Sequence, residues 1–93
     1  MKEIEVKYQA CNLCDALHRN INSNFESVSF DLLDNGDIKI KIVLNKKTEI
    51  EEEHIDDLVT EFEALQQTNC VKEVTTNVGK HYLPLKHLVY QKE

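Results

Sequence analysis

The chain has 93 residues, of which 41% are hydrophobic and 30% charged, and a formal net charge of −6. This length allows one two-layer domain with a single core but is too short to enclose a roomy active site. The negative charge argues against general nucleic-acid binding, which needs clustered Lys and Arg, and no apolar stretch approaches the roughly 20 residues that cross a bilayer.

The first 21 residues predict a strand followed by a helix. Residues 3–8 alternate between charged and apolar side chains, which is the period of a half-buried strand. Over residues 10–21 the apolar period changes to 3.6, which predicts an amphipathic helix. The apolar face of this helix would contain Ala10, Leu13, Cys14, Leu17 and Ile21.

Residues 27–44 predict a β-hairpin. A two-residue turn at 35–36 would set the apolar side chains of its strands on opposite faces, which a one-sided core cannot accept. A three-residue loop over 34–36 avoids this conflict, with Gly36 in the left-handed region because it has no Cβ. That loop pairs Leu32 with Ile38, Phe30 with Ile40 and Val28 with Ile42.

A second helix is predicted to begin at Thr48, because residues 48–51, TEIE, have the form of a capping box. Between residues 48 and 69 the sequence has eight carboxylates and no Lys or Arg. Residues 71–78 then predict a last strand. The expected buried stripe of the helix consists of Ile55, Leu58, Val59, Phe62 and Leu65.

The predicted order is β-α-β-β-α-β, the order of ferredoxin-like α+β folds. Both helices would cover one face of a four-stranded antiparallel sheet, and the uncovered face would be polar. We expect residues 1–79 to form this domain and residues 80–93 to form a C-terminal arm or edge strand.

Cys11 and Cys14 form a Cys-x-x-Cys where the predicted strand gives way to the helix, and His18 follows one turn later. A Cys-x-x-Cys in this loop resembles that of heavy-metal-associated domains, which hold a soft cation between two thiolates. The resemblance covers only residues 11–14, and the Gly-Met-x that usually precedes the first cysteine is replaced by residues 8–10, Tyr-Gln-Ala. The sequence is therefore not assigned to that family.

The residues themselves leave two interpretations of the cysteines open. Zinc would need a fourth ligand besides Cys11, Cys14 and His18, for which Cys70 is the candidate, whereas Cu(I) needs only the two thiolates. Alternatively, Cys14 is a small apolar side chain in the buried face of the helix. We predict this second case, with no metal and no cofactor, and keep a soft-metal carrier as the alternative function.

No other motif in the sequence predicts catalysis. Two glycines cannot build a phosphate-binding loop, and no nucleophile motif is present. No aromatic residue falls on the predicted open face of the sheet, which argues against RNA binding by base stacking. With no apolar signal segment and an odd number of cysteines, we expect a cytoplasmic protein that is not an enzyme.

Two segments predict binding to other proteins. The acidic helix at 48–69 could face a basic protein partner, although a solvated helix face explains the same charges. Residues 80–90 are largely apolar, and Pro84 favours an extended arm, so we expect a homodimer. The sequence thus predicts a self-associating interaction module whose dimer interface contains Tyr82, Leu83, Leu85, Leu88 and Tyr90.

Overall fold

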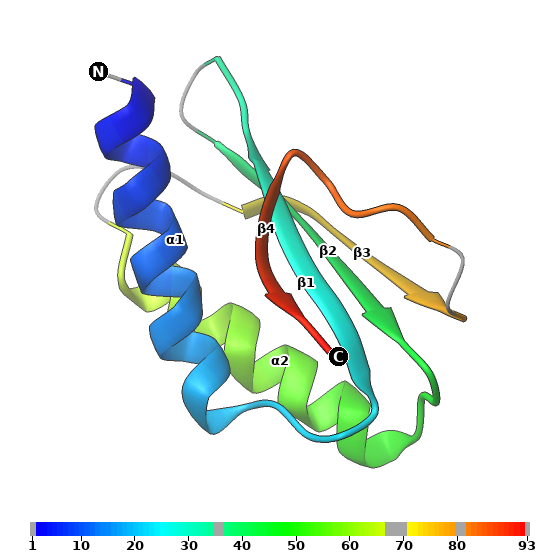
Figure 1. Ribbon diagram of the computed structural model, residues 1–93. Coiled ribbons are helices and arrows are strands. Elements are labelled where there is room, and N and C mark those ends of the chain that lie inside the picture. Colours follow the sequence, from blue (N-terminus) through cyan, green and yellow to red (C-terminus); the bar gives the residue numbers. More distant parts are fainter. Residues whose placement is uncertain (1, 35–36, 67–70, 80–81, 93) are drawn as a thin grey trace.

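The computed structural model describes residues 2–34, 37–66, 71–79 and 82–92, without the side chains of residues 2–5, 19 and 72. Two helices pack on one face of a four-stranded sheet, which makes a two-layer α+β structure (Figure 1). The elements in chain order are α1 (Lys2–Arg19), β1 (Phe25–Leu32), β2 (Ile38–Leu44), α2 (Glu49–Ala64), β3 (Val71–Val78) and β4 (His87–Gln91).

The sheet is mixed, with the strand order β3-β2-β1-β4. Strand β1 is antiparallel to both β2 and β4, whereas β2 and β3 are parallel, joined by α2 as the crossover. The prediction of an α+β fold with two helices and a four-stranded sheet is confirmed, but the ferredoxin-like topology is not. The described elements run α-β-β-α-β-β, and the sheet is not antiparallel throughout.

The predicted strand at residues 3–8 is wrong, because these residues form the first turns of α1. Val6 packs against the core, and Tyr8, which the strand pattern placed on the same face, is 50% exposed. Val6 and Ala10 extend the helical spacing of Leu13 and Leu17 backwards, and no Gly or Pro interrupts it. The position beside β1 is taken instead by β4.

The hairpin register is confirmed, with Leu32 opposite Ile38 and Phe30 opposite Ile40. The Leu33 N–H donates to the Asp37 carbonyl at 2.8 Å, which closes the loop around residues 34–36. Asn35 and Gly36 lie outside the described residues, so the left-handed conformation of Gly36 stays a prediction.

The capping box at the start of α2 is also confirmed. The Thr48 hydroxyl accepts from the Ile50 N–H at 3.2 Å, and the Thr48 N–H donates to the Glu51 carboxylate at 2.7 Å. The helix ends at Ala64, and Leu65 caps it by donating to carbonyls of the last turn.

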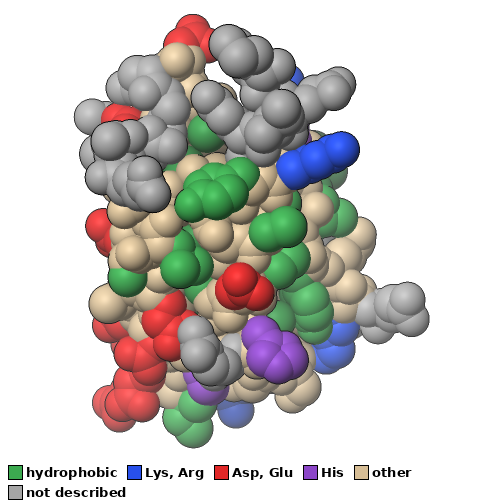
Figure 2. All heavy atoms as spheres, turned by 90° about the vertical axis from the view of Figure 1, so that its left-hand side faces the viewer, with side chains coloured by type: hydrophobic (Ala, Val, Ile, Leu, Met, Phe, Trp, Pro, Cys, Tyr) green, Lys and Arg blue, Asp and Glu red, His purple; other side chains and the backbone are tan. Residues whose placement is uncertain are grey.

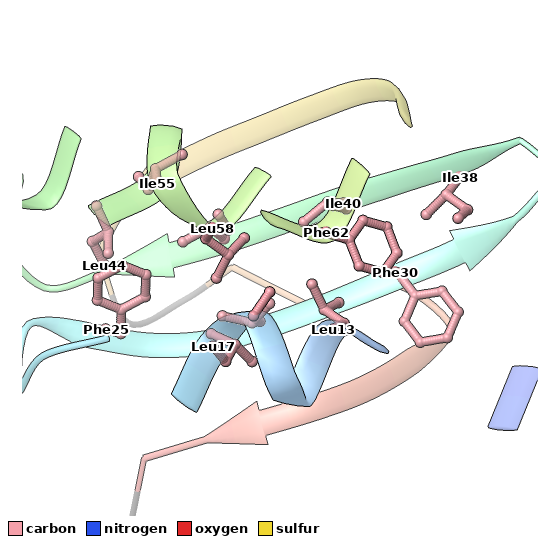
Figure 3. Close-up of a cluster of buried hydrophobic side chains, with 13 residues drawn as sticks. Leu13, Leu17, Phe25, Phe30, Ile38, Ile40, Leu44, Ile55, Leu58 and Phe62 are labelled. Atoms are coloured by element: carbon pink, nitrogen blue, oxygen red, sulfur yellow. The ribbon is translucent and has the colours of Figure 1, made fainter. Parts of the chain in front are cut away.

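The core lies between the helices and the sheet face beneath them (Figure 3). Leu13 and Leu17 of α1 and Leu58 and Phe62 of α2 point toward the same row of β1 and β2 side chains. The buried residues from the sheet side are Phe25, Val28, Phe30, Ile38, Ile40, Ile42 and Leu44.

The opposite sheet face is crossed by residues 82–86, which we call the strap (Figure 1, orange). The Leu85 N–H donates to the Ser29 hydroxyl at 2.8 Å, and the Lys41 ammonium donates to the Leu83 carbonyl at 2.7 Å. Ser29 is fully buried, and Val43 beside it is 2% exposed. The strap therefore covers the middle of a face that the sequence predicts to be open.

Candidate interaction surfaces

The predicted metal ligands of α1 lie in the middle and at the end of the helix and face solvent. Cys11 and Cys14 are exposed free thiols, and His18 is exposed as well. Among the described residues, no group of three His, Cys, Asp or Glu side chains lies close enough to hold a metal ion. The possible fourth ligand, Cys70, lies outside the described residues.

The surroundings of Cys14 disfavour its thiolate form. Partial burial of the sulfur raises the pKa of Cys14, and Cys11 and Asp15 add to the rise. The helix begins at Lys2, so neither cysteine has the help of a helix N-terminus in forming a thiolate. The face of the molecule on the side of α1 combines hydrophobic, acidic, basic and histidine side chains, with acidic side chains gathered along one margin (Figure 2).

The prediction that Cys14 belongs to the buried face of its helix is wrong. The buried face of α1 is turned towards α2 and includes polar side chains as well as apolar ones. Gln9 and Gln66 exchange two hydrogen bonds of 2.8 Å, and Asn20 donates to the Glu61 carboxylate at 2.7 Å. Sequence reasoning missed these residues because it sought apolar side chains only.

The exposed carboxylates of α2 form an acidic surface, which we define as Glu49, Glu52, Glu53, Asp56, Asp57 and Glu63. Its described contact with a cation is a long ion pair of 3.7 Å between Glu52 and Lys47. Glu51 is 2% exposed and does not belong to it, since its carboxylate is used inside the fold. The carboxylates thus face solvent as the sequence predicts.

The predicted interface residues of the C-terminal segment are divided between the two sides of the sheet. Tyr82, Leu83 and Leu88 are 47%, 79% and 44% exposed, whereas Leu85 is half-buried and Tyr90 packs against the core. Tyr82 and Leu88 line a small hollow on the strap side together with Pro84, Ser27 and Val43.

Two larger hollows flank the core. One of about 1030 Å³ lies between the start of α1, the end of β1 and the strap, and includes Val6, Leu32 and His87. The other, of about 700 Å³, is a groove between α2 and the edge strand β3. We call it the α2–β3 groove, and it is lined by Lys47, Glu52, Ile55, Asp56, Val59, Thr60, Val74 and Thr76.

A family model described as MafI2 immunity protein matches residues 8–93, which include all four strands, α2 and most of α1. The chain belongs to the MafI2 immunity protein family. A search of the curated proteins finds no similar protein.

Membership in the MafI2 family indicates a toxin–immunity role, in which the chain binds a partner protein as an inhibitor. A MafI2 immunity protein therefore needs a binding surface more than a catalytic centre. The acidic surface, the strap and the α2–β3 groove are three candidate surfaces of this chain. Neither described helix is long and apolar enough to span a membrane.

Proposed function

We propose that this chain neutralises a cognate protein toxin by binding it, without chemical change to either protein. The family match over residues 8–93 carries this proposal, because it extends across nearly the whole fold and not across a short motif. The exposed surfaces described above give a partner protein places to bind. A soft-metal carrier has less support, since the described residues contain no group of three possible ligands close enough to hold a metal ion.

We further propose that the toxin presents a basic surface to the acidic surface of α2. Six exposed carboxylates along one helix create a negative potential that accelerates the encounter with a positively charged partner. The attraction between exposed charges is screened by salt, so association should slow as ionic strength rises.

The cytoplasm is the proposed place of action. Cys11 and Cys14 are exposed free thiols, which suits a reducing compartment.

The homodimer remains a proposal for which Tyr82, Leu83 and Leu88 are the exposed residues. The apolar C-terminal segment is a weaker argument for a dimer than the sequence suggests, because β4 and the strap pack within one chain. Light scattering at micromolar concentration measures the oligomeric state directly.

Growth of cells that produce the toxin tests the proposed function. We expect the wild-type chain to restore growth when both are co-expressed, and the purified chain to bind an inactivated toxin domain in calorimetry. The double variant Asp56→Lys, Asp57→Lys should associate more slowly than the wild type, whereas Glu26→Lys, away from α2, should not. Toxicity that the wild-type chain leaves unchanged, with no binding at micromolar concentration, would overturn the proposal.

A further inference from the structure

Strand β3 forms an edge of the sheet. It has eight residues and pairs with β2 on one side, and none of the described strands pairs with its other side. From Glu73 to Val78 its register with β2 is regular. An edge strand of this length presents a row of backbone donors and acceptors to which another chain can add a strand.

The hydrogen bonding of Gly79 shows which residues of β3 face outward. The Gly79 N–H donates to the Leu44 carbonyl of β2 at 2.8 Å. Successive residues of a strand direct their N–H and C=O groups to opposite edges, so residues 73, 75 and 77 also face β2. The outward backbone groups therefore belong to Val74, Thr76 and Val78.

Two of these three residues line a hollow that has both apolar and polar side chains. Val74 and Thr76 line the α2–β3 groove, whose other wall contains Ile55 and Val59 of α2. Val78 at the end of the strand is 48% exposed. A segment added to this edge would therefore gain backbone hydrogen bonds, and every second side chain could enter the groove.

The other edge of the sheet is less suited to receive a strand. Strand β4 has five residues, its register with β1 is interrupted by an irregularity, and α1 lies beside it. Short and irregular edges hinder the addition of strands. The two edges thus differ, and β3 is the receptive one.

The charges around the α2–β3 groove indicate the chemistry of its occupant. Asp56 and Glu52 lie on the α2 side of the groove, and Glu52 forms an ion pair with Lys47 at 3.7 Å. The acidic surface continues along α2 from these residues. A segment with apolar side chains at alternate positions and a Lys or Arg between them would match both the groove and its wall.

We propose that an extended segment of the toxin adds to the outer edge of β3 as a fifth strand. Its apolar side chains would contact Ile55, Val59 and Val74, and a Lys or Arg would pair with Asp56. This inference rests on the proposed function, because it names the surface by which the same toxin is bound.

Thr76→Pro is the sharpest variant, because it removes an outward N–H without removing a hydrogen bond to β2. We expect it to weaken binding of the inactivated toxin domain by at least about tenfold, whereas Thr76→Ala, which keeps the N–H, should change it less than about threefold. Amide hydrogen exchange of Val74, Thr76 and Val78 should slow when the toxin binds.

A second pair of variants tests the groove from the α2 side. Thr60→Arg places a long cationic side chain at the groove, and Leu65→Arg makes the same change in charge at the exposed end of the helix. The first should weaken binding and the second should not. If circular dichroism shows that Thr76→Pro does not fold, this pair and the exchange measurement decide the question.

Several outcomes would overturn the docking proposal. Toxin binding that survives both Thr76→Pro and Thr60→Arg would show that another surface is used, while the proposed function stands. A wild-type dimer that Thr76→Pro converts to a monomer would assign the edge to a second copy. Failure of the wild-type chain to bind the toxin would overturn the proposed function and this docking site with it.

Discussion

The Glu51 carboxylate accepts a hydrogen bond from the Asn22 side chain at 2.8 Å, which joins the first turn of α2 to the loop between α1 and β1. Asn24 donates to the same oxygen at 3.2 Å, and the Thr48 hydroxyl donates to the other at 2.6 Å. A residue that the sequence identifies only as part of a helix cap therefore also fastens α2 to the loop that leads into β1.

These hydrogen bonds make the free energy of unfolding depend on pH. Those from the Thr48 hydroxyl and then the Asn22 amide lower the pKa of Glu51 to about 2 from 4.5. A lowered pKa stabilises the folded state above the unfolded value, so this contribution is lost as pH falls from about 4.5 to about 2. Glu51→Gln should unfold at lower urea than the wild type at about pH 6, and the difference should shrink at about pH 2.5. An equal difference at both pH values would contradict this explanation.

The strap should depend on Ser29. Ser29→Ala removes the acceptor of the Leu85 N–H on a fully buried side chain, which we expect to cost about 1–3 kcal/mol in the free energy of unfolding. Ser23→Ala, at an exposed position, should cost less than about 0.5 kcal/mol. Urea denaturation of the two variants measures both values, and equal losses would show that the hydrogen bond does not hold the strap.

Gly79, where the chain leaves β3, should not tolerate a side chain. Its φ of 133° is one that L-residues rarely adopt, and an added Cβ would lie 3.3 Å from the Tyr82 ring. We expect Gly79→Ala to destabilise the fold by about 1 kcal/mol or more, measured by thermal or urea unfolding. A variant as stable as the wild type would mean that this turn can change its conformation freely.

The cysteines of α1 should show no metal chemistry. We expect protein purified under reducing conditions to contain no stoichiometric zinc or copper, measured by elemental analysis. Because the pKa of Cys14 is raised, in a Cys11→Ser variant this thiol should react with a disulfide reagent at neutral pH more slowly than in the unfolded chain. One equivalent of bound metal, lost in Cys11→Ser, would restore the soft-metal carrier.

The hairpin and the cap of α2 could be predicted because each depends on residues close together in sequence. The register of Phe30 and Ile40 follows from the apolar alternation and the loop length, and the cap follows from Thr48 and Glu51. Residues 3–8 were predicted wrongly because charged and apolar residues alternate there while also fitting a helix. The deciding contact, β4 beside β1, involves residues about 60 positions apart and leaves no local pattern.

The candidate site was less accessible from sequence than the fold. The carboxylates of α2 could be predicted from the sequence, because the residue type alone identifies each charge. The α2–β3 groove depends on β3 lying parallel at the edge of the sheet, which no short stretch of residues encodes. Polar pairs such as Gln9 and Gln66 were missed for the same reason, since neither amide predicts its distant partner.

The position of β4 makes assembly of this protein a late event. The central strand β1 emerges from the ribosome before its partner on one side, His87–Gln91, which is the last strand of the sheet in chain order. Until β4 has been synthesised, one border of β1 stays unpaired, and its sequence FESVSFDL can pair with other nascent chains. A ribosome that stalls before His87 would release a chain without β4. The sheet of this protein is therefore complete only after β4 has been synthesised.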